Sequence, residues 1–400
     1  MKIAVAAPST IPARRANTIQ VMKMAQALVQ CKHEVTVLVP DLKSELKLNK
    51  SGSSQWENLA NHYGIQNEVP VHWLSSFPPF RHYDFAIKVI RWTRKNRIDL
   101  VYTRMPQVAA LGSSINLKTI FEVHDLPSGR IGPELFKLFL NGKGAMRLVV
   151  ITKALLNELE EQFDLPKSPS FTILAPDGVD LDRYQELPDP KNARQRLRDS
   201  RNDLKDLAPD KFTAGYTGHL YDGRGISLII RIASSLPDAN FLIVGGEPNQ
   251  INQLSEAVLS KGIKNILTTG FVPNAELPLY QASCEVLMLP YQTKVAASSG
   301  GDISKFLSPM KLFEYLACGR VIMASDLPVL REVLNPKNAV LLPADMADKW
   351  LEALIEIKEN PDHWNLLAET ARRLSAKYSW KSRAEKIVEN LDFGQRINLR

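Results

Sequence analysis

The stretch Ser308–Asp326 combines side chains that could bind a phosphate and a ribose. Ser308 suits the N-cap of a helix, and Pro309 suits its first position. The free N–H groups and the positive dipole end of such a helix favour a phosphate. Lys311 and Glu314 are three residues apart and share one helical face, where Glu314 could accept hydrogen bonds from a ribose diol. A solvent-exposed Glu–Lys pair on an ordinary helix has the same spacing, so that alternative stays open.

A glycine-bearing loop at residues 218–225 offers two more groups that can donate to a phosphate, His219 and Arg224. It follows a strand predicted at residues 212–217 and leads into a helix. A glycine-rich turn before a helix favours phosphate binding. The glycines do not have the G-x-G-x-x-G spacing, so a structural role for Arg224 on the surface remains the alternative.

Four charged or titratable side chains stand in loops of the first half of the chain. Arg104 and His124 directly follow strands predicted at 99–103 and 118–123. Because ligands of open α/β sheets bind beyond the carboxyl ends of the strands, both are predicted near a site. His124 could instead be a satisfied structural residue. Arg14 and Arg15 lie in the first loop, where they could meet a phosphate or simply be solvated.

The predicted elements alternate between strand and helix in both halves of the chain. Apart from the strands already given, strands are predicted at residues 2–7, 33–40, 147–152, 240–244, 265–270, 284–290 and 321–324. A capping box of Asn17 and Gln20 would start the helix at 19–30. This alternation in 400 residues predicts two Rossmann-like α/β domains, 1–187 and 210–377, with a C-terminal helix at 378–400 assigned to the first.

Composition narrows the class of protein. A hydrophobic content of 44% with 23% charged residues is ordinary for a soluble globular chain. No apolar run has the length of a membrane span, and the N-terminus has neither the length nor the charge of a signal peptide. The three cysteines, Cys31, Cys284 and Cys318, have no zinc-binding spacing and fit a reducing compartment. These features predict a cytoplasmic protein without a metal site.

The net charge of +7 includes a basic helix predicted at residues 84–96. One side of this helix is apolar, and the opposite side carries four cations, Lys88, Arg91, Arg94 and Lys95. Such a face predicts an acidic partner, and an anionic membrane surface is one candidate. A solvated helix face, packed on the sheet by its apolar stripe, is the alternative.

The sequence SPMKLFEYLACG around Glu314 resembles the donor-binding segment of the retaining, sucrose-synthase-like glycosyltransferases, the glycosyltransferase group 1 family. That segment usually has two glutamates separated by seven residues; the second is Glu314, and Phe306 holds the position of the first. The loop 218–225 resembles the diphosphate loop of the family, with His219 in place of an arginine and Arg224 one position early for its lysine. The resemblance implies the B-type architecture, two Rossmann-like domains that face across a cleft, with the C-terminal helix crossing back to the first.

The resemblance also implies a function: a retaining, metal-independent transferase that moves a sugar from a nucleotide-diphosphate sugar to an acceptor, without a cofactor. The acceptor would belong to glycan, glycolipid or cell-envelope polysaccharide synthesis. The implied catalytic residues are His124, Arg224 and Glu314. The predicted donor site holds His219, Arg224, Ser308, Lys311, Glu314 and Asp302, the last from a predicted mobile loop at 295–305 and able to replace the carboxylate missing at Phe306. Arg14, Arg15 and Arg104 are candidates for the acceptor side or a phosphate.

Two other classes of protein fit the same pattern. A nucleotide-sugar epimerase of this architecture would need no acceptor, and a two-lobed solute-binding protein would also show paired α/β halves. The expected partners are a nucleotide sugar and a lipid-linked or otherwise anionic acceptor at the inner face of a membrane, with no nucleic acid.

Overall fold

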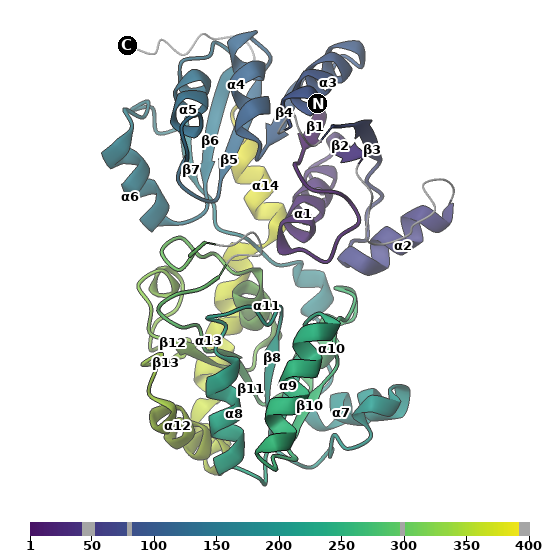
Figure 1. Ribbon diagram of the computed structural model, residues 1–400, viewed down its shortest axis with the longest axis vertical. Helices are drawn as coiled ribbons and strands as arrows, with labels where there is room; N and C mark the ends of the chain where they lie inside the picture. The colour runs from purple at the N-terminus through teal and green to yellow at the C-terminus, as the bar shows by residue number, and fades with distance from the viewer. Residues whose placement is uncertain (42–52, 78–81, 297–300, 392–400) are drawn as a thin grey trace. The chain divides into compact units, whose positions relative to one another are not determined.

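The computed structural model describes residues 1–41, 53–77, 82–296 and 301–391 of the chain (Figure 1). Its contacts divide the chain into two compact units, Met1–Asp177 with Trp380–Arg400, and Gly178–Ser379. The first unit ends before residue 187, the boundary expected from the sequence. The reason is that Val179 and Tyr184 are buried in the core of the second unit.

Unit 1 is built on a seven-stranded sheet in the order β3-β2-β1-β4-β5-β6-β7, in which every pairing is parallel. The central strands are buried on both faces, which explains their nearly continuous apolar runs. The strands are β1 (Lys2–Ala6), β2 (Glu34–Asp41), β3 (Val71–Ser75), β4 (Leu100–Thr103), β5 (Thr119–Val123), β6 (Ala145–Val150) and β7 (Thr172–Leu174).

The helices of unit 1 pack in two groups. Helices α3, α4 and α5 contact one another in a row, whereas α14 packs on α1. Their bounds are α1 (Ala16–Gln30), α2 (Ser53–Tyr63), α3 (Tyr83–Lys95), α4 (Pro106–Ser114), α5 (Gly132–Leu140), α6 (Lys153–Gln162) and α14 (Trp380–Val388). The predicted capping box at the start of α1 is wrong. The N-cap is Arg15, and the Asn17 side chain donates to Ser9 Oγ (2.5 Å) instead.

Unit 2 is a six-stranded parallel sheet in the order β10-β9-β8-β11-β12-β13. Alternate residues of its strands enter two different cores. Phe241, Val286 and Met323 pack with α8 (Ile226–Ser235) and α12 (Ala347–Glu359). Their neighbours Leu242, Leu287 and Ile322 pack with α11 (Met310–Cys318) on the other face. The strands are β8 (Thr213–Thr217), β9 (Asn240–Val244), β10 (Ile266–Thr268), β11 (Val286–Leu289), β12 (Val321–Ser325) and β13 (Val340–Leu342).

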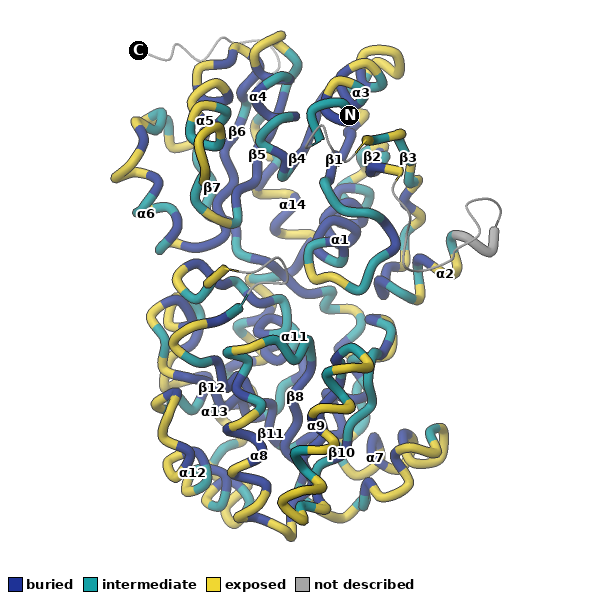
Figure 2. The backbone as a smooth tube through the Cα atoms, in the orientation of Figure 1, coloured by how far each residue is buried: buried dark blue, intermediate teal, exposed yellow. Residues whose placement is uncertain are grey.

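The helices of unit 2 cover both faces of its sheet, and in Figure 2 the four central strands are buried while the outward sides of the helices are exposed. Their bounds are α7 (Pro190–Ser200), α8 (Ile226–Ser235), α9 (Pro248–Ser260), α10 (Leu277–Ala282), α11 (Met310–Cys318), α12 (Ala347–Glu359) and α13 (Asn365–Ser375). The prediction of two Rossmann-like halves is confirmed.

The strand order reverses direction once in each sheet, between β1 and β4 in unit 1 and between β8 and β11 in unit 2. Ligands of doubly wound sheets bind beyond the carboxyl ends of the strands at this switch point. Arg104 directly follows β4, and Gly218 and His219 directly follow β8. The fold therefore brings predicted site residues of each unit to the switch point of its own sheet.

Candidate active site

The loop after β8 lies directly against the main chain that follows β11. A Cβ added to Gly223 would lie 2.0 Å from the carbonyl oxygen of Lys294, and one added to Gly225 would lie 1.9 Å from that of Pro290. Both glycines have a backbone φ of +80°, a value that residues with a side chain rarely adopt. Only glycine fits at these two positions, and they hold Arg224 between them at the switch point.

Arg224 and Lys311 approach the same aromatic ring from two different elements. The guanidinium carbon of Arg224 lies 5.2 Å from the ring centre of Tyr291, and Arg224 Nη2 donates to the carbonyl of Ala296 (3.3 Å). Lys311 Nζ, from the first turn of α11, lies 5.6 Å from the same ring and 3.7 Å from the ring centre of Tyr216. The loop and α11 thus gather two cations, as the sequence predicts for a phosphate site.

The Lys311 amine is buried and has no hydrogen-bond acceptor in the described part of the chain. The main chain of Gly218 lies beside it, since a Cβ built there would be 2.6 Å from Nζ. Burial and the charge of Arg224 lower the pKa of Lys311 well below its ordinary value, although Glu314 raises it. A buried lysine nitrogen without a hydrogen-bond acceptor is costly, and an anionic ligand would supply the acceptor and favour the charged form of the side chain.

Glu314 is held by a network of buried polar side chains. Its Oε2 atom accepts a hydrogen bond from Gln281 Nε2 (3.0 Å), and Gln281 Oε1 accepts one from the Tyr184 hydroxyl (2.8 Å). The Tyr315 hydroxyl accepts from the Thr217 amide (2.8 Å), which ties α11 to the end of β8. The second carboxylate oxygen of Glu314 makes no hydrogen bond to the described residues, so it can accept from a ligand.

The start of α11 differs from the sequence prediction. The helix begins at Met310, its N-cap is Pro309, and no side chain caps it. Ser308 therefore lies before the cap instead of forming it, because the proline at 309 still has extended backbone angles (φ −79°, ψ 122°). Phe306 is buried, with 8% of its surface exposed, which suits an apolar residue at the position where the family usually has a glutamate.

Two further predicted donor-site residues have structural contacts of their own. The His219 ring stacks on Tyr221, with 4.9 Å between ring centres and 14° between planes. Asp302 Oδ1 accepts from the amides of Val295 (3.0 Å) and Ser304 (2.9 Å), and these bonds lower the pKa of its carboxyl. Asp302 thus stabilises its own loop through one oxygen, and its contact with a sugar stays a prediction.

A buried cluster of charged side chains surrounds His124 in unit 1. His124 Nε2 contacts Glu122 Oε1, the oxygen to which Gln20 Nε2 also donates (2.6 Å). The other oxygen of Glu122 is paired with Arg383 Nη2 (2.9 Å) from α14. Burial and the nearby charge of Arg104 lower the pKa of His124 to about 4, although Glu122 raises it. The imidazole is therefore neutral near pH 7.

Arg104 and Asp177 complete this cluster. Arg104 Nη1 donates to Gln20 Oε1 (3.0 Å), and burial lowers the pKa of Arg104 to about 10 although Asp177 raises it. Burial raises the pKa of Asp177 to about 7, against the opposing effect of Arg383. The other predicted arginines lie apart from these contacts in the loop before α1, where Arg15 is exposed at the N-cap.

Several residues around His124, and around Lys311 and Glu314, were not predicted from the sequence. Glu122 offered a signal, because a carboxylate inside the apolar strand β5 has to be paired. Arg383 offered none, since it lies 261 residues from Glu122 along the chain. Gln281 and Tyr216 are likewise ordinary residues of a helix and a strand until the fold places them beside Glu314 and Lys311.

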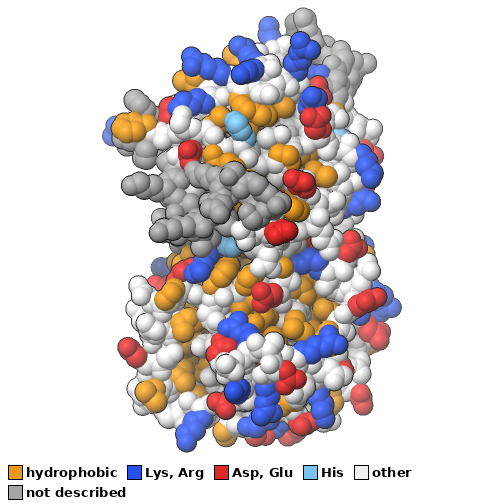
Figure 3. Space-filling model, turned by 90° about the vertical axis from the view of Figure 1, so that its right-hand side faces the viewer, with side chains coloured by type: hydrophobic (Ala, Val, Ile, Leu, Met, Phe, Trp, Pro, Cys, Tyr) orange, Lys and Arg blue, Asp and Glu red, His pale blue; other side chains and the backbone are white. Residues whose placement is uncertain are grey.

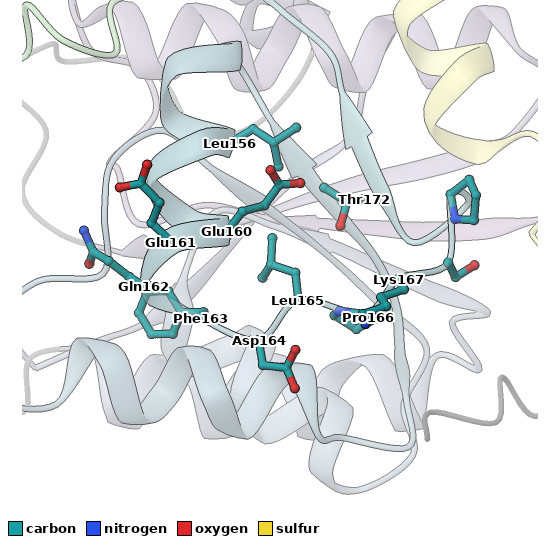
Figure 4. Close-up of a pocket in the computed structure, with 12 residues that line it drawn as sticks. Leu156, Glu160, Glu161, Gln162, Phe163, Asp164, Leu165, Pro166, Lys167 and Thr172 are labelled. Atoms are coloured by element: carbon teal, nitrogen blue, oxygen red, sulfur yellow. The ribbon is translucent and has the colours of Figure 1, made fainter.

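A separate hollow of about 600 Å³ lies in unit 1 beside the end of α6 (Figure 4). Glu160 and Glu161 from α6, together with Asp164, give it an acidic lining. None of the predicted site residues lines this hollow. Among the residues that the structure describes, no helix is both long enough and apolar enough to span a membrane.

The two doubly wound sheets define the class of fold, which is that of the B-type glycosyltransferases. Residues 211–360 match the family model described as "Glycosyl transferases group 1", and residues 18–183 match "Glycosyltransferase Family 4". The chain belongs to the group 1 glycosyltransferases, and the resemblance seen in its sequence is confirmed.

Two curated relatives share about a quarter of their aligned residues with this chain. The alpha-galactosylglucosyldiacylglycerol synthase of Streptococcus pneumoniae is 23% identical over 271 residues, 64% of this chain and 66% of the relative. The GDP-mannose-dependent alpha-(1-6)-phosphatidylinositol monomannoside mannosyltransferase of Mycolicibacterium smegmatis is 26% identical over 223 residues, 54% of this chain and 55% of the relative. The chain thus spans about half to two thirds of the length of these relatives.

Solved structures share the fold over nearly the whole chain. Anabaena Alr3699/HepE in complex with UDP-glucose superposes with a TM-score of 0.70 at 16% identity, covering 98% of this chain and 99% of the other. Sucrose-phosphate synthase from Thermosynechococcus elongatus gives a TM-score of 0.71, also at 16% identity, covering 96% and 97%.

Proposed function

We propose that this protein transfers a sugar, with retention of anomeric configuration, from a nucleoside-diphosphate sugar to an acceptor. The observation that carries the proposal is the Lys311 amine, which is buried beside Arg224 without an acceptor in the described part of the chain. Two cations at the switch point of a doubly wound sheet suit the diphosphate of a sugar nucleotide. The open carboxylate oxygen of Glu314 suits the ribose.

The leaving group in such a transfer is a nucleoside diphosphate, whose negative charge grows as the glycosidic bond breaks. Groups that already point at this charge stabilise the transition state more than the ground state. In this proposal Arg224 and Lys311 supply that positive charge and Glu314 anchors the nucleoside. His219, Ser308 and Asp302 would line the donor site, and His124 would contact the donor sugar.

The donor assignment is supported by the structure of Anabaena Alr3699/HepE, which is a complex with UDP-glucose, and the acceptor by the names of the curated relatives. Both names refer to glycolipids: one relative is a galactosylglucosyldiacylglycerol synthase, and the other is a phosphatidylinositol monomannoside mannosyltransferase. We therefore propose a lipid-linked acceptor, with Arg14, Arg15 and Arg104 as candidates for its anionic part.

Purified protein and a panel of sugar nucleotides test the proposal. With a lipid acceptor present, we expect a glycosylated lipid; without one, we expect only slow hydrolysis of the donor. Glu314→Ala and Arg224→Ala should each reduce transfer at least about tenfold, about 1.4 kcal/mol. Glu352→Ala is the control, because Glu352 is exposed and forms a surface pair with Lys349. A new epimer without acceptor would identify an epimerase, and wild-type kinetics in both site variants would refute the donor site.

We also propose that α3 binds an anionic membrane surface. Figure 3 shows Lys and Arg side chains gathered at the upper end of one face of the molecule. Arg91, Arg94 and Lys95 of α3 are exposed, and 46% of Ile87 is exposed nearby on the same helix. Lys88 donates to Ser75 of β3 and is less available.

Sedimentation with vesicles tests this contact. Near an anionic surface each cation contributes about 1 kcal/mol, screened by salt. We expect binding to anionic but not neutral vesicles at low salt, and its loss in an Arg91/Arg94/Lys95→Gln variant. Arg196/Arg198→Gln on α7 is the matched control, since both arginines are exposed. Equal binding by both variants, or none by the wild type, would leave α3 as a solvated helix.

A further inference from the structure

Glu122 accepts hydrogen bonds from three sides, although it lies in an apolar strand. Only 1% of its surface is exposed. Gln20 Nε2 donates to Oε1 (2.6 Å), Arg383 Nη2 donates to Oε2 (2.9 Å), and His124 Nε2 contacts Oε1. Residues two apart in a strand point to the same face, which explains why Glu122 and His124 meet where β5 ends.

The orientation of the Gln20 amide is fixed by a further contact. Arg104 Nη1 donates to Gln20 Oε1 (3.0 Å), and a guanidinium can only donate. The oxygen of this amide therefore faces Arg104, and its nitrogen faces Glu122. Because Gln20 Nε2 donates, the Glu122 oxygen that it contacts must be an acceptor.

The charge state of Glu122 then decides which nitrogen of His124 carries the proton. Burial favours the neutral acid, but Arg383 and His124 outweigh it and lower the pKa of Glu122 below its ordinary value. An ionised carboxylate can only accept, so His124 Nε2 must carry a hydrogen. A neutral imidazole has only one N–H, and the Nδ1 lone pair of His124 is then exposed as an acceptor.

We propose that Glu122 is a positioning residue that holds His124 in its Nε2–H form, so that Nδ1 accepts a hydrogen bond from a hydroxyl of the donor sugar. The second half of this inference rests on the proposed function, in which His124 faces that sugar. His124 then orients the sugar and is not the group that protonates the leaving diphosphate. Nδ1 makes no hydrogen bond to the described residues, so this position is open to a ligand.

Nuclear magnetic resonance of the full chain, labelled with ¹⁵N in its histidines, reads the tautomer directly. The ring signals of His124 are identified by their loss in His124→Gln, and the exposed His363 serves as the solvent reference. We expect the Nε2–H tautomer for His124 at neutral pH. Finding the Nδ1–H tautomer or an imidazolium would overturn the proposal.

A Glu122→Gln variant tests the positioning role. Its amide can present N–H to the ring, which should convert His124 to the Nδ1–H tautomer. The donor KM should then rise about tenfold, while affinity for the free nucleoside diphosphate stays unchanged, because only the sugar contact is lost. If this variant does not fold, the tautomer of wild-type His124 still tests the role of Glu122. Gln20→Leu removes one donor to Glu122 and keeps its charge, so it is the control that should leave the Nε2–H tautomer unchanged.

The experiments distinguish a failure of the positioning role of Glu122 from a failure of the proposed function. An unchanged tautomer and an unchanged donor KM in a folded Glu122→Gln variant would refute the positioning role. If wild-type His124 shows the Nε2–H tautomer but the protein binds no sugar nucleotide, the proposed function fails and the assignment of Glu122 stands.

Discussion

Replacing Arg383 with methionine should destabilise unit 1 strongly. Arg383 is 5% exposed and donates from α14 to Glu122, to the carbonyls of Ala175 and Pro176, and to the Tyr102 hydroxyl. Methionine fills much of the volume but leaves the Glu122 carboxylate buried without its charged partner. Breaking a buried ion pair in this way costs about 3–5 kcal/mol. For a unit of this size that lowers the melting temperature by roughly 6–20 °C.

The pH dependence identifies the cause of this loss. In the wild type the pKa of Glu122 is lowered, so its contribution to stability is present above the unfolded pKa and is lost as the pH falls. In Arg383→Met, Glu122 loses its charged partner on α14, while His124 and Gln20 still contact it. Burial should then be the larger effect, and the pKa of Glu122 should rise above its unfolded value of about 4.3. The variant should then regain stability as the pH falls toward that value, and the difference between the two proteins should shrink in acid.

Scanning calorimetry of both full-length proteins at about pH 7 and about pH 5 measures this difference. Arg331→Met is the matched control, because Arg331 forms an exposed pair with Asp326 that contributes at most about 1 kcal/mol. The reasoning is refuted if Arg383→Met is as mild as the control, or if its loss of stability does not change with pH.

Three other perturbations follow from the same contacts. Asp177→Asn should stabilise the protein at high pH. Because the folded pKa of Asp177 is about 7, the free energy of unfolding of the wild type should fall by about 4 kcal/mol as the pH rises from about 4 through about 7. Urea titrations across that range should show no such fall in the variant. Lys311→Met should weaken sugar-nucleotide binding about 10–100-fold. Wild-type affinity should fall as the pH rises, because Lys311 must be protonated to bind phosphate, and calorimetry should find no such pH dependence in the variant. Gly225→Ala should abolish sugar-nucleotide binding, since its Cβ would overlap the Pro290 carbonyl. Gly262 also has a positive φ, of +65°, but no atom lies within 4 Å of an added Cβ, so Gly262→Ala should leave binding intact.

The parts of the fold that the sequence predicted are those with short-range signals. Parallel strands covered on both faces are continuous apolar runs, so the runs before Arg104 and His124 were recognised as strands. Lys311 and Glu314 were predicted to share a face because helical spacing fixes it, and both take part in the contacts around α11. Local polar patterns were less reliable: Asn17 bonds to Ser9, and the cap of α11 falls on Pro309.

The cluster around Glu122 could not be predicted in the same way. Its members come from α1, β5, the residue after β4 and α14, and no spacing rule links such distant positions. Arg383 lies in the C-terminal helix predicted at 378–400, and nothing in the sequence distinguishes it from the other basic residues there. Its partners are defined by the packing of α14 on α1, which is a property of the finished tertiary structure.

Arg383 and Lys311 show why burial alone does not mark a ligand site. Both cations are buried, but Arg383 has protein acceptors for its guanidinium, and its removal should be felt in stability. The Lys311 amine has no acceptor in the described residues, so the folded protein bears a desolvation cost that its own contacts do not offset. A cost of this kind is relieved when an anion binds. The same substitution by methionine should therefore destabilise the protein at 383 and leave it folded, with weakened nucleotide binding, at 311.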